Sequence, residues 1–348
     1  MIYPKFLKEN DTIGICAPSA GIGEEKTKYF EKSLENIKKE VYQIKETASV
    51  RNEGVVSNTG KIRGEEFNQL VKDETVDMIW CASGGDMLVE MLDFVDEKAF
   101  IQNPKWVSGY SDPTTLLFHI TTNLDIATLY GNNAGSFDMS ELHPSLKNAL
   151  EIVKGNLVKQ ESFEMCEINR FNVMQGEKEE VEGQVPILES NVDGYNLDTK
   201  VEWKTPNRPV DITGRLIGGC IDCLNFIIGT KYDGTKKFIE KYKEDGIIWY
   251  FDNFALKSED LFFVLWHMKQ AGWFEYTKGF VFGRTLFEGT FLDMSYEEAV
   301  KRALGEEVPI IMEADIGHVA PKFTIINGAI GRFKAENGKG SLEMWLKE

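Results

Sequence analysis

Short apolar segments alternate with helical segments through residues 12–130, and this alternation constrains the fold more than any other feature of the chain. Strand-like runs end in polar loops at residues 18–23, 83–86 and 109–113, and each loop leads into a segment with helical spacing. Strands that alternate with helices predict a parallel sheet with helices on both faces. Because functional loops follow the carboxyl ends of parallel strands, we expect these three loops to meet at one edge of the sheet.

The individual elements follow from the same periodicity. In the first half we expect strands at residues 12–17, 42–49, 78–82 and 126–130, and helices at 24–40, 61–72 and 87–94. The second half mixes the two less regularly, with strands expected at 212–220, 246–252, 279–283 and 310–312 and helices at 221–228 and 258–271. The fold class is therefore α/β.

The loop at residues 109–113 is the strongest candidate for chemistry. It reads Gly109-Tyr110-Ser111-Asp112-Pro113 between an apolar strand and a helix. A serine on such a turn is lifted off the sheet, and the free N–H groups that open the helix can stabilise an oxyanion beside it. Ser111 could equally cap the helix, and Pro113 replaces the second glycine of the Gly-x-Ser-x-Gly pattern. The turn alone leaves both interpretations open.

Length and a change of pattern predict two domains. A chain of 348 residues is long for one hydrophobic core. From about residue 154 the sequence becomes polar and rich in turn residues, before strands and helices resume near residue 210. We therefore expect an N-terminal α/β domain that carries the serine at 1–155, a linker or insertion at 156–209, and a C-terminal domain at 210–348.

Charge and composition exclude several classes of partner. The formal net charge is -17, from 39 basic and 56 acidic residues, which argues against nucleic acid or an anionic membrane surface as a partner. No stretch is apolar for long enough to span a bilayer, and the first residues lack the apolar core of a signal peptide, so we expect a cytoplasmic protein.

No cofactor or metal is expected from the motifs. The glycines at 21 and 23 lack the third glycine of a dinucleotide site. The Cys-x-x-Cys at 220–223 has no second pair at zinc-ribbon spacing. The five cysteines form an odd, sparse set, so we expect them to be reduced and structural: Cys16, Cys81, Cys166, Cys220 and Cys223.

Two residues of the second half are candidate partners for Ser111. His318 follows Gly317 just after a strand, where a loop histidine is well placed to act as a general base. Asp252 ends the most apolar strand of this half and could orient an imidazole, although a cap or loop acid is an equally good interpretation. Together with Ser111 they form a possible triad split across two domains.

Six motifs resemble those of the LD-carboxypeptidase family of serine peptidases, and within it the branch of the microcin C self-immunity peptidase (MccF-like). They lie at residues 13–19 (IGICAPS), 63–68 (RGEEFN), 79–85 (IWCASGG), 109–115 (GYSDPTT), 214–219 (GRLIGG) and 314–318 (ADIGH). The similarity spans nearly the whole chain. It implies a flavodoxin- or Rossmann-like N-terminal domain and a C-terminal mixed α/β domain resembling a swivelling barrel.

The resemblance also assigns roles to residues. It implies that Ser111 is the nucleophile and His318 the general base, and it places Asp252 on the family's triad glutamate, one methylene shorter. The backbone N–H groups of Gly85 and Asp112 map to the oxyanion hole. Gly84, Asn132 and Trp203 are expected to contact the substrate; Trp203 could stack on a base or simply pack in the core.

The function implied by the resemblance is hydrolysis of a C-terminal amide-type bond in a small peptide or a peptidyl or aminoacyl nucleotide. The long stretch at 160–209 favours the MccF-like branch. Two alternatives stay open: a carboxypeptidase that cuts between an L-centre and a C-terminal D-residue in murein tetrapeptides, and a non-hydrolytic binding protein on the same scaffold, suggested by the shorter acid. The family tends to form homodimers, so a homodimer is expected.

Overall fold

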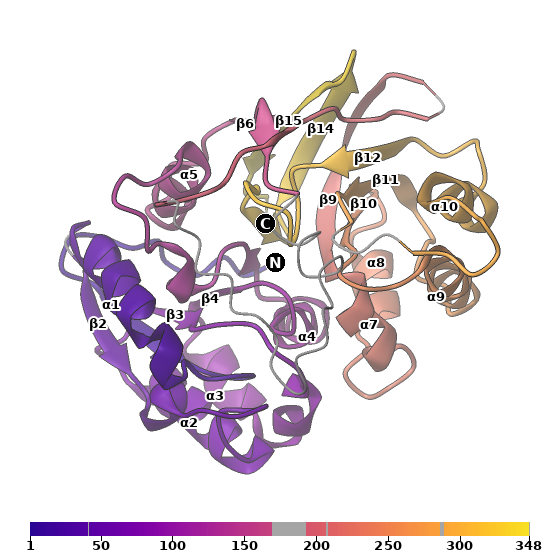
Figure 1. Cartoon of the computed structure of the whole chain (residues 1–348). Helices are drawn as coiled ribbons and strands as arrows, with labels where there is room; N and C mark the ends of the chain where they lie inside the picture. The colour runs from indigo at the N-terminus through magenta and orange to yellow at the C-terminus, as the bar shows by residue number, and fades with distance from the viewer. Residues whose placement is uncertain (41, 169–192, 207, 286–288, 348) are drawn as a thin grey trace.

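The computed structural model describes residues 1–40, 42–168, 193–206, 208–285 and 289–347, which fold around two sheets (Figure 1). The N-terminal part contains β1 (Thr12–Cys16), α1 (Glu24–Lys38), β2 (Gln43–Glu46), α2 (Gly60–Lys72), β3 (Met78–Cys81), α3 (Glu97–Gln102), β4 (Trp106–Gly109), α4 (Thr114–Leu124), β5 (Thr128–Tyr130) and α5 (Pro144–Val153). The remainder contains β6 (Gln160–Glu161), β7 (Met165–Cys166), β8 (Thr199–Lys200), β9 (Val210–Cys220), α7 (Ile221–Ile227), α8 (Thr235–Lys241), β10 (Ile247–Asp252), α9 (Ser258–Gln270), β11 (Thr277–Gly283), α10 (Tyr296–Leu304), β12 (Ile310–Ala314), β13 (Ile325–Asn327), β14 (Ile330–Glu336) and β15 (Lys339–Trp345).

The first sheet is the parallel sheet that the alternating pattern predicts. Its strand order is β13-β5-β4-β3-β1-β2, and the five strands of the N-terminal part are parallel. The order 2-1-3-4-5 is that of flavodoxin-like sheets, in which ligands bind beyond the carboxyl ends of the strands near the switch between β1 and β3. Its central strands β3 and β4 are buried throughout, as expected for a sheet with both faces covered.

Two expected elements of this part differ from the structure. The segment expected as a helix at 87–94 is a 3₁₀ helix, Leu88–Phe94, preceded by Met87 in the left-handed conformation with a φ of 65°. The strand expected at 42–49 ends at Glu46 and continues as a 3₁₀ helix, Ala48–Arg51. Both changes occur in the segments that lead away from the sheet edge, where tertiary contacts outweigh local propensity.

The second sheet is mixed and has seven described strands in the order β12-β11-β10-β9-β14-β15-β6. Strands β9 to β12 are parallel, and β10 (IIWYFD), which lies between β11 and β9, is buried at every position. The sequence pattern did not predict β14 and β15, which form an antiparallel hairpin against β9. An α/β architecture with a parallel N-terminal sheet and a second sheet domain is thus confirmed.

The segment expected to link the domains packs on the second sheet at both of its described ends. Strand β6 pairs with β15, and Lys204 bridges to Met312 in β12. Residues 169–192 and 207 of this segment lie outside the described residues. In the part of the chain that the structure describes, no helix is long and apolar enough to cross a membrane.

The two sheets are joined by helix α4 and by β13. Helix α4, which follows the Ser111 loop, lies between the first sheet and helices α7 and α8 of the second domain (Figure 1). Strand β13 comes from the C-terminal half but pairs antiparallel with β5 in the first sheet. Its last residue, Asn327, accepts hydrogen bonds from the Gly218 N–H (3.3 Å) and the Tyr250 hydroxyl (2.7 Å) and donates to Thr128 Oγ1 (3.3 Å).

Replacing Asn327 should weaken both domains together. Asn327→Ala leaves the buried Gly218 N–H and Tyr250 hydroxyl without this partner, so we expect a loss of about 3 kcal/mol in the free energy of unfolding. Urea unfolding followed by circular dichroism measures it, and the exposed Asn156→Ala, which should change stability by less than about 0.5 kcal/mol, is the control. Equal stability of the two variants would contradict this account.

Candidate active site

Ser111 occupies a strained turn between β4 and α4. Its φ is 70°, in the left-handed region that a non-glycine residue rarely adopts. The turn is closed by a hydrogen bond from the Thr114 N–H to the Ser111 carbonyl oxygen (2.8 Å). Strain of this kind persists only where the surroundings enforce it, and it is common at active sites. The conformation is that of a nucleophile-bearing turn rather than of a serine that caps a helix.

The three predicted loops meet at one edge of the first sheet. The Ser19 hydroxyl donates to the carboxylate of Asp112 and contacts the Asp86 carbonyl oxygen at 3.1 Å. The Ala20 N–H donates to the Gly84 carbonyl oxygen (3.2 Å), which joins the first loop to the second. This network holds the glycine loop beside Ser111.

His318 comes from the loop after β12 and contacts Ser111 directly. Its Nε2 lies 2.9 Å from the Ser111 Oγ, although 207 residues separate the two in the chain. The imidazole is held between the rings of Tyr110 (centroid distance 5.2 Å) and Phe254 (4.6 Å). These rings limit the orientations of the imidazole while leaving Nε2 directed at the serine.

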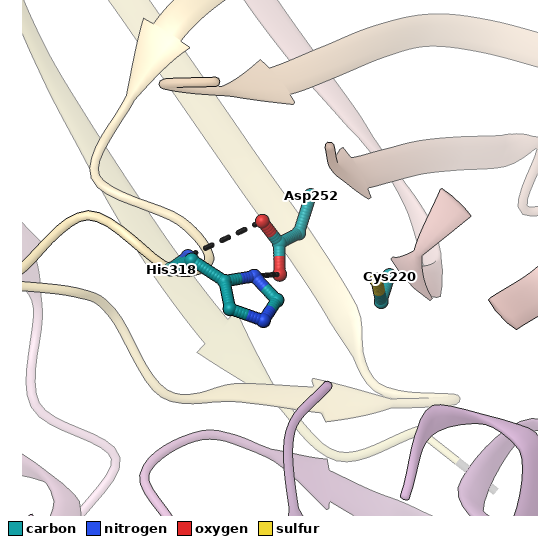
Figure 2. A group of neighbouring side chains, drawn as sticks. All are labelled: Cys220, Asp252 and His318. Atoms are coloured by element: carbon teal, nitrogen blue, oxygen red, sulfur yellow. Dashed lines mark hydrogen bonds and ion pairs between the residues drawn. The ribbon is translucent and has the colours of Figure 1, made fainter. Parts of the chain in front are cut away.

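Asp252 lies on the other side of the imidazole, at the end of β10. Its Oδ2 is 2.7 Å from His318 Nδ1 and accepts a hydrogen bond from the Tyr130 hydroxyl (2.6 Å), while its Oδ1 accepts the His318 backbone N–H (3.2 Å). Figure 2 shows the carboxylate turned toward the His318 backbone nitrogen and Nδ1. The Nδ1–Oδ2 distance is that of an ion pair or a charge-assisted hydrogen bond.

The surroundings of Asp252 keep its carboxylate ionised. Burial raises its pKa, but the nearby imidazole and the hydrogen bonds from His318 and Tyr130 outweigh burial and hold the pKa below its ordinary value. A carboxylate in contact with Nδ1 orients the imidazole so that Nε2 faces Ser111. Gly317 makes this contact possible, because its φ is 98° and a Cβ at this position would lie 2.0 Å from Asp252 Oδ1.

Two backbone N–H groups beside Ser111 could receive an oxyanion. The N–H groups of Gly85 and Asp112 donate no hydrogen bond to the described part of the chain. Gly85 has a φ of 140°, and a Cβ there would meet Ser19 Oγ at 2.7 Å. A Cβ on Gly84 would lie 3.0 Å from the Ser111 Cβ, so the absence of a side chain leaves the face of the serine open.

One group of side chains in the described residues has metal-ligand geometry, and it overlaps this site. Cys220, Asp252 and His318 each offer a donor atom within 4.8 Å of the other two, and Figure 2 shows the Cys220 sulfur beside the acid and imidazole. A metal would need the Cys220 thiolate. The contact with Cys223 and burial raise the pKa of the Cys220 thiol well above its usual range. The three residues therefore suit an acid–histidine pair with a neutral neighbouring thiol better than a metal site.

The other predicted substrate residues lie deeper in the protein. Asn132 is buried after β5; its carbonyl oxygen accepts the Trp80 indole N–H (2.8 Å), and its Nδ2 has no partner among the described groups. Trp203 is 3% exposed, donates its indole N–H to Asp315 (2.8 Å) and packs on Phe323. Trp203 therefore packs in the core and is not placed to stack on a base of the substrate.

Sequence reasoning missed several residues around the site. Tyr130, which binds Asp252, ends a strand at the same sheet edge, and Ser19 follows the first strand; both positions could have been found from the loop geometry. Lys322, whose ammonium lies 3.3 Å from the centre of the Tyr110 ring, carries no pattern that would have identified it. The cysteines are all buried and free, as predicted.

Comparison with known proteins agrees with this geometry. The N-terminal domain model of the LD-carboxypeptidases matches residues 13–131, and the C-terminal domain model matches residues 213–333. The chain belongs to the LD-carboxypeptidase family. Family membership indicates a carboxypeptidase-type hydrolase.

Individual relatives come from both branches of this LD-carboxypeptidase family. The microcin C7 self-immunity protein MccF of Escherichia coli is 32% identical over 126 residues, 36% of this chain and 37% of that protein. The structure of MccF with aspartyl sulfamoyl adenosine has a TM-score of 0.76 at 21% identity and covers 100% of both chains. The muramoyltetrapeptide carboxypeptidase of Oxalobacter formigenes has a TM-score of 0.72 at 16% identity, over 96% of this chain and 98% of that one.

Gly317→Ala should impair activity more than stability. The new Cβ would displace the Asp252 carboxylate and move the imidazole away from Ser111. A displacement of about 1 Å at reacting groups can cost on the order of 100-fold in kcat/KM, which is the loss that we expect. The matched control is Gly305→Ala, a glycine with φ 86° and open space around it. A similar effect of the two changes on activity would contradict the role given to Gly317.

The Asp112 carboxyl group should make stability depend on pH. Burial raises its pKa to about 6, although Ser19 and the Leu88 N–H oppose the shift. The native protein therefore binds this proton more tightly than the unfolded chain, so the stability that it contributes at pH 4 is lost as the pH rises through 6. We measure the free energy of unfolding in urea from pH 4 to 7. Relative to wild type, that of Asp112→Asn should increase as the pH rises. A constant difference in this free energy between the two proteins would contradict the assignment.

Proposed function

We propose that the protein is a serine peptidase in which Ser111 is the nucleophile, His318 the general base and Asp252 the acid that orients the imidazole. The observation that carries the proposal is the continuous contact from the strained Ser111 through His318 Nε2 (2.9 Å) and Nδ1 to Asp252 (2.7 Å). Nucleophile, base and orienting acid within such reach are the signature of triad catalysis.

The proposed reaction follows acyl-transfer chemistry. His318 Nε2 takes the proton of Ser111 Oγ, which attacks the scissile carbonyl carbon. The N–H groups of Gly85 and Asp112 donate to the oxyanion of the tetrahedral intermediate, and the ionised Asp252 stabilises the imidazolium. The imidazolium then gives its proton to the leaving group, and water, activated by His318, releases the acyl group from Ser111.

We propose as substrate a small peptide or an aminoacyl or peptidyl nucleotide, cut at a C-terminal amide-type bond. MccF, with the same fold, is known in complexes with aspartyl sulfamoyl adenosine and with glutamyl sulfamoyl guanosine. Gly84 and Asn132 stay in the proposal as substrate contacts because Gly84 borders Ser111 and the Asn132 amide has an unused donor. The buried Trp203 is left out of it.

The proposal extends to the location and assembly of the protein. A cytoplasmic location fits five free, buried thiols, because thiols stay reduced in that compartment. Assembly as a homodimer stays a prediction from the family resemblance.

Two other functions are each favoured by one observation. The fold shared with a muramoyltetrapeptide carboxypeptidase favours release of a C-terminal D-residue from murein tetrapeptides. The aspartate at position 252, one methylene shorter than the glutamate of the family, favours a protein that binds these ligands without cutting them.

Hydrolysis of two substrates separates these functions. Purified protein is incubated with an aminoacyl sulfamoyl adenosine and, separately, with a murein tetrapeptide ending in D-alanine, and products are measured by mass spectrometry. We expect cleavage of the nucleotide, with a loss of at least about 1,000-fold in Ser111→Ala. Release of D-alanine alone would favour the murein enzyme. Tight binding of either compound, with equal and negligible turnover in both proteins, would overturn the peptidase.

A further inference from the structure

Lys322 is a buried cation beside Tyr110, the residue that precedes the proposed nucleophile. It lies four residues after His318 in the same loop, and it is 3% exposed. Its Nζ lies 3.3 Å from the centre of the Tyr110 ring, the residue that precedes Ser111 and whose ring also contacts the His318 imidazole. The ammonium is thus separated from the Ser111–His318 pair by one aromatic ring.

The charge of Lys322 has no anion or acceptor of its own. Among the described groups, none hydrogen-bonds to Nζ or forms an ion pair with it, and Asp252 acts on it only at longer range. Other buried cations are satisfied: Arg215 pairs with Asp245 (2.6 Å), and Lys105 donates to the Leu70 carbonyl oxygen (2.8 Å). Burial lowers the pKa of Lys322 to about 7, which reflects the cost of an ammonium without a partner.

The peptide among the substrates proposed above carries the missing partner. A peptide that loses its C-terminal residue has a free carboxylate on the leaving side, only two bonds beyond the scissile nitrogen. A carboxylate recognised in a site that excludes water needs a cation, and a lysine on a flexible stem can turn its ammonium from an aromatic face toward such a ligand.

We infer that Lys322 binds the terminal carboxylate of the substrate and so determines selectivity for peptides with a free C-terminus. The inference rests on the proposed function, because the carboxylate would bind at a subsite of the proposed active site around Ser111. The cation–π contact with Tyr110 holds the ammonium next to Ser111 before the ligand arrives. Binding then replaces a weak partner by a charge-assisted hydrogen bond.

The test compares a murein tetrapeptide ending in D-alanine with the same peptide bearing a C-terminal amide. Wild type should prefer the acid, and Lys322→Met should lower the acid-over-amide ratio of kcat/KM roughly 10- to 100-fold, mainly through KM. Lys322→Arg should restore part of the ratio. Lys231→Met, which removes another lysine that lies over a tyrosine ring, should leave the ratio unchanged.

Binding measured without turnover keeps the inference separate from the peptidase proposal. In the Ser111→Ala background, calorimetry should show that Lys322→Met weakens binding of the acid peptide and not of the amide. Equal weakening of both peptides, or of neither, would overturn the carboxylate subsite even if wild type is an active peptidase. If Lys322→Met weakens binding of the acid peptide alone while wild type shows no turnover, the result would support the carboxylate subsite and count against the peptidase proposal. The melting temperature of Lys322→Met should not fall, because it removes a poorly solvated charge.

Discussion

The return of the chain from the second domain to the first sheet is the constraint on which the rest of the structure depends. Strand β13 pairs with β5, so the segment just before it, which carries His318, must pass the end of the first sheet where Ser111 lies. The hydrogen bonds of Asn327 tie the same strand to β9 and β10. Because Asp252 ends β10, this crossing brings all three residues together, and the contacts of His318 with Asp252 and Ser111 complete the arrangement.

The acid at the end of β10 shows how packing compensates for a short side chain. Asp252 is fully buried and reaches the imidazole because Gly317 lets the His318 backbone approach the carboxylate closely. Four interactions then act on one carboxylate: the imidazole, the His318 N–H, the Tyr130 hydroxyl and the more distant Lys322 charge. Ionisation in a buried position is stabilised by this set rather than by any one partner.

The parts of the fold that depend on local pattern could be predicted from the sequence. The alternation of strands and helices predicted the parallel sheet and the meeting of its loops, because both follow from periodicity and from rules of connection. Strands β13 and β14 were missed because their partners, β5 and β9, lie more than one hundred residues away, and such pairing leaves no local trace. Strand β15 pairs with the adjacent β14, and the Asn337-Gly338 turn between the two strands is a hairpin signal that could have been used. At the site, Ser111 had a recognisable turn. Lys322 did not, because its importance comes only from burial beside Tyr110.

The central claim is that Ser111 is an activated nucleophile, and covalent labelling tests it most directly. The folded protein is treated with a fluorophosphonate, and its mass and tryptic peptides are measured. The account predicts one adduct per chain, located on Ser111, with labelling that becomes much slower in His318→Gln. No adduct on folded protein, or an adduct on another residue with Ser111 unmodified, would contradict it.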